Sequence, residues 1–319
     1  MSDAYPHIAR ARFLLHIGPP KTGTTSLQEL VLPRIDGLVY LGKPWFNPDV
    51  PYDKCVNLHR AVDSVTKAPL GHFDADMARR AVEDWLTHSP AFAAASGRPL
   101  CLLSEERLTL SDVVSQVEIA ARLSQVFPGA HAVYVRREPV AALLSLYKWL
   151  YARAWIHDSF SRWIDKALRP GSTSTGAVGL RYYDWAALKR GYGAHFPMHH
   201  AEMGDMHRDV HRFMADYLGE AGPLAEAGAA LLAETRHTVL NVSRNRAVSE
   251  LHRGVKLAIR GWNKLPFSKL DEKPEYLGEG PMWDRLEAPL RRLPLGQGKF
   301  RVTDQDRERI ARYYAERGN

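Results

Sequence analysis

The stretch FLLHIGPPKTGTTSLQEL, residues 13–30, determines the expected fold. Its first residues form an apolar run that is typical of a buried strand, and a turn containing glycine, proline and Lys21 follows. Three consecutive hydroxyl side chains, Thr24, Thr25 and Ser26, then open a segment with the pattern of a helix. Unpaired N–H groups and the positive dipole end make a helix start a site for phosphate. The stretch therefore predicts a strand, a phosphate-binding loop and a helix.

The position of Lys21 separates this loop from a common alternative. In the nucleoside-triphosphatase signature G-x-x-x-x-G-K-[ST] the lysine follows the second glycine, whereas Lys21 precedes Gly23. Gly18 and Gly23 let the backbone turn tightly and approach a ligand closely. Lys21 would lie over the loop, and in this position its positive charge would be directed at the bond that is broken in the reaction. The plainer interpretation is a threonine-capped helix after a Gly-Pro turn, with a solvated lysine.

Apolar strands and helical segments alternate downstream, and this alternation predicts an α/β fold. We expect three layers, with a mostly parallel central sheet and helices on both faces. Ligands bind such sheets at the carboxyl ends of the strands. Three strands end in polar sequences that should therefore meet along one edge: GPPKTGTT, SEER and RREP. We expect a single domain over residues 1–319, with an irregular arm at about 264–300 that covers the substrate or cofactor.

Some segments give local expectations. Residues 43–72, which contain several prolines, look irregular, and PGSTSTGAVG at 170–179 looks like a loop. The helical pattern SDVVSQVEIAARLSQVF opens with Ser111 or Asp112 as its cap. A helix starts at Pro139, and an amphipathic helix ends at Gly219.

The composition is that of a soluble globular protein, and it narrows the function classes. A formal charge of +7 suggests an anionic ligand, but the basic residues are scattered and no nucleic-acid-binding motif is present, so we expect no nucleic acid. We find no stretch of signal-peptide length before the first strand and no run long enough to span a membrane. The expected location is cytoplasmic, without membrane insertion. Two cysteines make no disulfide framework or metal motif.

The segment HIGPPKTGTTSLQ closely resembles the 5′-phosphosulfate loop of sulfotransferases that use 3′-phosphoadenosine-5′-phosphosulfate (PAPS). That family implies a second motif, in which a strand is followed by an arginine and, in the next helix, by a serine. The sequence VYVRREPVAALLSLYKW contains Arg137 and, eight positions later, Ser145. In the family these two residues bind the 3′-phosphate. Glu138 departs from the usual Asn or Asp, and Arg136 could share the role of Arg137.

The resemblance implies a fold, a donor and a set of site residues. The fold is the P-loop-like sulfotransferase fold, and the donor PAPS needs no metal. Lys21 would stabilise the departing phosphate oxygen in an in-line transfer. Glu106, in LLSEERL, would be the base that activates the acceptor, with Glu105, His59 and His16 as alternatives. The residues expected to bind the donor are Lys21, Thr22, Gly23, Thr24, Thr25, Ser26, Arg137 and Ser145.

Other interpretations remain open. A P-loop nucleotide kinase or hydrolase, or a non-catalytic nucleotide-binding protein, shares this kind of fold. The acceptor could be a small molecule, a lipid or a glycan, and the oligomeric state is not predicted. His207 and His211 have an i, i+4 spacing that zinc can use, but no further ligand is evident, and we expect no metal. The aromatic run YKWLYARAW at 147–155 either lines an acceptor channel or packs in the core.

Overall fold

The sheet is built around the strand that was expected before the phosphate loop. In the computed structural model this strand is β1 (Arg12–His16), and it lies in the centre of five parallel strands ordered β2-β3-β1-β4-β5. The others are β2 (Val39–Tyr40), β3 (Leu100–Ser104), β4 (His131–Arg136) and β5 (Met198–Glu202). In the register of β1 and β3, His16 is paired with Ser104. All five residues of β3 are buried, and its first four form a continuous apolar run, as expected for a strand with helices on both faces of the sheet.

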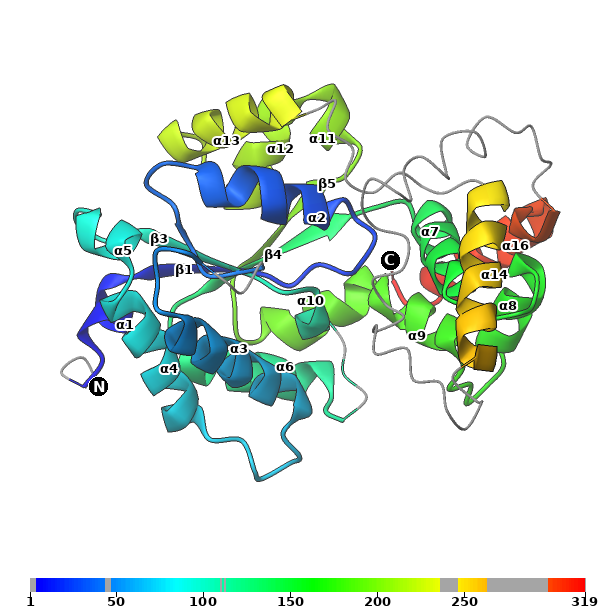
Figure 1. Cartoon of the computed structure of the whole chain (residues 1–319), viewed down its shortest axis with the longest axis horizontal. Coiled ribbons are helices and arrows are strands. Elements are labelled where there is room, and N and C mark those ends of the chain that lie inside the picture. Colours follow the sequence, from blue (N-terminus) through cyan, green and yellow to red (C-terminus); the bar gives the residue numbers. More distant parts are fainter. Residues whose placement is uncertain are drawn as a thin grey trace. The chain divides into compact units, whose positions relative to one another are not determined.

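Helices cover both faces of this sheet, as expected for a three-layer α/β fold (Figure 1). Phe13 and Leu15 of β1 pack into one buried core with the helices on one face, and Leu14 packs into a second core on the opposite face. The first face carries α1 (Pro6–Arg10), α3 (Tyr52–Lys67), α4 (Ala75–Thr87), α5 (Pro90–Ala94), α6 (Gln116–Val126) and α10 (Trp185–Gly193). The second face carries α2 (Thr24–Ser26), a π-helical turn (Leu27–Val31), a 3-10 turn (Leu32–Arg34), α11 (Asp205–Arg208), α12 (Val210–Leu218) and α13 (Pro223–Glu234).

The structure describes residues 4–43, 47–109, 111, 113–235, 246–262 and 298–318. They fall into two compact units. The described residues of the first lie within Met1–Arg137 and Tyr182–Asn241, and this unit contains the sheet. The second consists of Glu138–Arg181 and Val242–Gly318. The single domain over residues 1–319 stays a prediction. Residues 264–297 of the expected arm lie outside the described residues, and Gly298–Phe300 form a 3-10 turn.

The second unit is helical. It contains α7 (Pro139–Ala152), α8 (Phe160–Ala167), α9 (Thr175–Tyr182, whose last residue is assigned to the first unit), α14 (Arg246–Trp262) and α16 (Asp304–Ala315). Its core is aromatic: Tyr147 packs against Phe160, Trp163 and Phe300. The expected helix start at Pro139 is confirmed, and Glu138 is its N-cap, accepting hydrogen bonds from two backbone N–H groups.

Three local expectations were wrong. The prolines that made residues 43–72 look irregular flank a 16-residue helix, α3, which buries Leu58, Val62 and Val65 on one face. Helix α6 begins at Gln116 and is capped by Ser115, not by Ser111, which instead accepts from Val113 N in the preceding turn; Asp112 lies outside the described residues. The expected loop at 170–179 becomes helical from Thr175.

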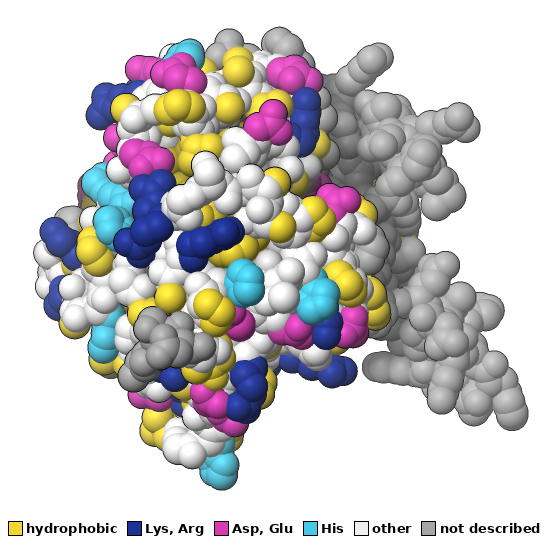
Figure 2. All heavy atoms as spheres, turned by 90° about the vertical axis from the view of Figure 1, so that its left-hand side faces the viewer, with side chains coloured by type: hydrophobic (Ala, Val, Ile, Leu, Met, Phe, Trp, Pro, Cys, Tyr) yellow, Lys and Arg dark blue, Asp and Glu magenta, His cyan; other side chains and the backbone are white. Residues whose placement is uncertain are grey.

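Two properties of the molecule bear on its possible partners. Within the described ranges, no helix combines the length and the apolar character needed to cross a bilayer. Figure 2 shows one face, on which Lys and Arg side chains are interspersed with Asp, Glu and hydrophobic ones.

Candidate functional site

The loop after β1 has the tight backbone geometry that its sequence indicated. Lys21 has φ +67° and Gly23 has φ +81°, so two of the loop residues are in the left-handed region. Gly23 adopts this conformation at little cost, whereas a side-chain-bearing residue such as Lys21 is strained by about 1 kcal/mol or more. Gly23 is the N-cap of α2, which begins at Thr24 as predicted, and it offers no side-chain cap to the first amides. The first N–H groups of the helix therefore have no side-chain cap.

A buried histidine lies directly beneath the loop. His16 is fully buried, its Nδ1 lies 2.7 Å from Ser104 Oγ, and its Nε2 has no hydrogen-bond partner among the described residues. A Cβ at Gly18 would lie 2.6 Å from that Nε2, so only glycine allows the loop to pass over the ring. Burial lowers the pKa of His16 to about 3, which keeps the imidazole neutral. His16 is therefore an unsuitable base for the acceptor, and it supports the loop instead.

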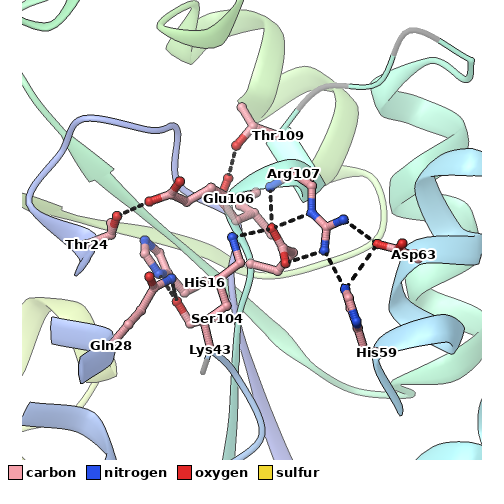
Figure 3. A network of polar contacts seen from close by, with 12 residues as sticks. His16, Thr24, Gln28, Lys43, His59, Asp63, Ser104, Glu106, Arg107 and Thr109 are labelled. Carbon is pink, nitrogen blue, oxygen red and sulfur yellow. Dashed lines mark hydrogen bonds and ion pairs between the residues drawn. The ribbon is translucent and has the colours of Figure 1, made fainter. Parts of the chain in front are cut away.

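The four hydroxyl groups of the loop are used differently. Thr22 is buried and donates to Pro19 O at 2.9 Å, so its side chain closes the loop on itself. Thr24 donates a hydrogen bond to the Glu106 carboxylate (Figure 3). The hydroxyls of Thr25 and Ser26 make no hydrogen bond to another side chain that the structure describes, and both residues are half-buried. Two hydroxyls at the helix start are thus left to contact a ligand.

The end of β3 carries two adjacent glutamates that have different environments. Glu105 is 1% exposed, and its carboxylate binds Arg107 at 2.8 Å and Lys43 at 3.2 Å. Burial alone would raise the pKa of Glu105, but the hydrogen bonds and charges of Arg107 and Lys43 outweigh it and hold the pKa below its ordinary value. Glu105 is therefore an ionised structural group, and it is a poor candidate for the base.

Arg107 connects Glu105 to helix α3. Its guanidinium also contacts the Asp63 carboxylate and lies 3.2 Å from His59 Nε2 (Figure 3). Because arginine can only donate, a hydrogen bond between the two side chains is accepted by His59 Nε2. The nitrogen of His59 that would take a proton is thus occupied. Four side chains were candidates for the base. Among the contacts described, Glu106 is the one candidate that is neither fully buried nor bound to a cationic side chain, and it is partly exposed.

The end of β4 reaches the same loop. Arg137 Nη1 donates to Lys21 O at 2.5 Å, which fixes the strained residue of the loop to the neighbouring strand. Tyr183, just before α10, donates to Pro20 O at 2.9 Å. Arg136 instead pairs with Glu202 of β5 at 3.3 Å. The three polar strand ends therefore meet at one edge of the sheet, as the sequence predicted, with Arg137 rather than Arg136 at the loop.

Ser145 lies on α7 in the second unit and is half-buried. Its predicted role, binding a phosphate together with Arg137, stays a prediction. The predicted roles of Lys21, Thr22, Gly23, Thr24, Thr25 and Ser26 in binding the donor also stay predictions.

Two contributors to the site were missed. Lys43 holds the strand end and Tyr183 holds the loop, and each does so through a contact between residues far apart in the sequence. A single sequence gives no signal for such contacts. Pairing of Glu105 with Arg107, the plainer interpretation of these adjacent residues, is what the structure shows.

Two secondary expectations can be compared with the structure. His207 lies on α11 and His211 on α12, and Asp209 separates these helices, so the i, i+4 spacing on one helix is not realised. In the part of the chain that is described, no three His, Cys, Asp or Glu side chains are grouped as metal ligands. In the aromatic run, Tyr147 and Tyr151 are core residues, whereas Trp155 is 50% exposed and packs edge-on against Trp149.

The chain is similar to two solved sulfotransferase structures. One is a sulfotransferase from Alicyclobacillus acidocaldarius, with 18% sequence identity and a TM-score of 0.42, covering 66% of this chain and 81% of that one. The other is the sulfotransferase domain from the curacin biosynthetic pathway, with 12% identity and a TM-score of 0.35, covering 88% of this chain and 96% of that one. No model of a known protein family matches the chain. No curated protein matches it either.

Proposed function

We propose that this protein is a PAPS-dependent sulfotransferase that moves a sulfuryl group to a hydroxyl or amine of an acceptor. The observation that carries the proposal is the loop itself. Lys21 stands before Gly23 in a left-handed conformation, Arg137 is bonded to its carbonyl, and Glu106 is bonded to Thr24. A lysine, a helix start without a side-chain cap and a carboxylate thus lie at one edge of the sheet, where α/β proteins bind ligands.

The residues present fit an anionic donor. The first amides of α2 have no side-chain cap, and the hydroxyls of Thr25 and Ser26 have no side-chain partner among the described residues. Both kinds of group donate hydrogen bonds to oxyanions. We assign the 5′-phosphate to these groups together with Thr22, Gly23 and Thr24 of the loop, and the 3′-phosphate to Arg137 and Ser145. PAPS, when bound, supplies the sulfuryl group and a phosphate leaving group.

The side chains of this chain have separate tasks in the proposed transfer. Lys21 neutralises the charge that develops on the oxygen released from sulfur. Glu106 accepts the proton of the acceptor hydroxyl or amine. Its hydrogen bond from Thr24 places this carboxylate against the loop, and Glu105, Arg107 and Lys43 fix the strand end from which it projects. No metal ligand is required, because cationic side chains and N–H groups supply the neutralisation.

One observation favours a second candidate, a nucleotide kinase or hydrolase. A threonine of the loop bonded to a carboxylate at the end of the neighbouring strand resembles the pair that holds magnesium in P-loop nucleotide hydrolases. The register of the loop argues against it. Counted from Gly18 and Gly23, Thr24 stands where the triphosphatase lysine belongs, and the magnesium hydroxyl would be that of Thr25. The contact with Glu106 comes from the wrong threonine for that mechanism.

Two measurements test the proposal. We expect 3′-phosphoadenosine-5′-phosphate to raise the melting temperature more than ATP with magnesium does, and stabilisation by ATP with magnesium alone would favour the kinase. We then expect transfer of labelled sulfuryl from PAPS to one member of a panel of phenols, glycans, lipids and amines. Lys21→Ala should lower this rate by about 10²–10³. Lys189→Ala, an exposed lysine on α10, is the matched control and should leave the rate unchanged.

The nature of the acceptor and the location are parts of the same proposal. The small-molecule, lipid and glycan classes remain alternatives that the acceptor panel distinguishes. We propose a cytoplasmic enzyme that neither binds nucleic acid nor inserts into a membrane.

A further inference from the structure

A groove rich in arginine lies within the second unit, away from the residues assigned to transfer. It has a volume of about 560 Å³ and is formed by α16 and by the turn between α8 and α9. Its charged lining consists of five guanidinium groups and one carboxylate: Arg169, Arg181, Arg309, Arg312, Arg317 and Glu316. The volume falls in the range of sites for small molecules.

Three of these arginines have no electrostatic partner in the described parts of the chain. The guanidinium groups of Arg169, Arg181 and Arg312 make no hydrogen bond or ion pair with any described residue. Arg309, by contrast, binds Asp306 at 2.6 Å and also contacts Asp165. Gathering unpaired like charges around one groove is unfavourable unless anions neutralise them. The lining therefore has a charge that only a ligand or solvent ions can balance.

The frame of the groove is rigid. On one side, Arg169 to Ser172 form a tight turn closed by Ser172 N donating to Arg169 O at 3.1 Å, with Pro170 second and Gly171 third at φ +69°. Proline and a left-handed glycine at these positions define a type II turn, which has little conformational freedom. The turn holds the backbone of Arg169 at the edge of the groove.

On the other side, α16 is fixed at both ends. Near its start, Ser161 of α8 donates to Asp306 at 2.7 Å, and Asp306 forms a capping box with Thr303. Near its end, the Tyr314 hydroxyl donates to Leu180 O of α9 at 2.9 Å. The two walls are thus joined on either side of the groove, so that binding costs little ordering of the backbone.

We propose that this groove binds a small oligoanion that carries two or more sulfate or phosphate groups. The planar fork of donors on arginine matches the oxygens of both groups, and several such groups on one molecule can engage Arg169, Arg181 and Arg312 together. The proposal concerns the second unit alone, and it does not depend on the proposed transfer reaction.

The test is isothermal titration calorimetry of the full chain at constant ionic strength. The probes are inositol hexakisphosphate and tripolyphosphate for the phosphate source, and sucrose octasulfate for the sulfate source; glucuronate, with a single charge, is the control. We expect at least one polyanion to bind and glucuronate not to bind. Binding of inositol hexakisphosphate or tripolyphosphate identifies a phosphate ligand, and binding of sucrose octasulfate identifies a sulfate ligand. Binding of none of the three polyanions would overturn the proposal.

Paired variants separate a defined site from general attraction to a basic protein. Arg181→Gln with Arg312→Gln should weaken binding at least about tenfold, since it removes two guanidinium groups that donate charge-assisted hydrogen bonds to the anion. Arg162→Gln with Arg307→Gln removes the same charge from exposed positions of the second unit outside the groove and should weaken binding less than about threefold. Equal weakening in the two double variants would refute a site at the groove.

Two further variants complete the design. Arg312→Lys keeps the charge but loses the planar fork, so we expect an affinity between those of the unmodified chain and the double variant. Lys21→Ala should leave the affinity unchanged; a loss of binding in this variant would assign the anion to the phosphate loop and overturn the proposal. Because the substituted arginines of the groove are exposed and unpaired, melting temperatures should stay constant and show that the variants are folded.

Discussion

The neutral histidine beneath the loop makes the stability of this protein depend on pH in a way that can be calculated. The pKa of His16 is about 3 in the folded chain, because burial disfavours the charged imidazolium, whereas an unfolded histidine has a pKa of about 6.5. As the pH falls below about 6.5, the unfolded chain takes up a proton that the folded chain does not. The contribution of His16 is therefore complete above pH 6.5 and declines between pH 6.5 and pH 3.

The magnitude follows from the two pKa values. Each pH unit within this window changes the free energy of unfolding by about 1.36 kcal/mol per proton. Between pH 7 and pH 5, His16 should therefore remove about 2 kcal/mol of stability. Other groups titrate over the same range, among them His199 and His200, whose pKa values burial also lowers. Their contributions cancel when two variants are compared at the same two pH values.

The assay is urea unfolding of the unmodified chain and of His16→Asn at pH 7 and pH 5. We expect the variant to lose about 2 kcal/mol less between these pH values than the unmodified chain. His72→Gln, at an exposed position outside any helix, should behave like the unmodified chain. Equal losses in the unmodified chain and His16→Asn would refute the reasoning. If His16→Asn does not fold, the chemical shifts of His16 in the unmodified chain decide the question, since protonation of the folded protein above pH 5 contradicts it.

Four further predictions concern the same edge of the sheet. Glu105→Gln should lower the free energy of unfolding by about 3 kcal/mol, because it leaves Arg107 and Lys43 without their buried partner, and denaturant unfolding measures this; a loss below about 0.5 kcal/mol would contradict it. Gly18→Ala should cost about 1–3 kcal/mol in the same assay, because its Cβ would meet the His16 ring, and an unchanged midpoint would show that the loop can move aside. Lys21→Gly should be more stable than Lys21→Ala by about 1 kcal/mol, since only glycine relieves the left-handed strain, and an order reversed in thermal unfolding would argue against this conformation. Glu106→Gln should lower kcat/KM for sulfuryl transfer by about 10²–10⁴ with unchanged melting temperature, and a fully active variant would exclude Glu106 as the base.

The sequence allowed the fold and the edge of the sheet to be predicted because both depend on local patterns. β1, β3 and β4 are apolar runs, and the polar residues after them needed only the parallel arrangement to be brought together. Helix α3 was missed because prolines at both sides concealed a regular apolar spacing between them. The cap of α6 was misplaced by four residues, since Ser111 and Ser115 are equally good capping side chains and only the turn at 111–114 distinguishes them.

The chemistry at the edge was less accessible to prediction. That Glu105 is buried and Glu106 is not depends on which of two adjacent side chains faces Arg107 and Lys43, and no local pattern encodes this. The neutral state of His16 likewise depends on the loop that passes above it. The contact of Arg137 with Lys21 O joins residues 116 positions apart. Such contacts follow from packing between elements rather than from the order of residues along one element.

The position of β1 in the sheet has a consequence for how the chain acquires its structure during synthesis. β1 is the first strand to be made but the central one, and its partner Ser104 on β3 follows His16 by 88 residues. Synthesis adds about 5–20 residues per second, so both edges of β1 stay unpaired for roughly 4–18 seconds until β3 has been made. For that time an apolar strand with unpaired N–H and C=O groups can join another chain. The strand that leads into this loop is thus also a segment that needs protection on the ribosome.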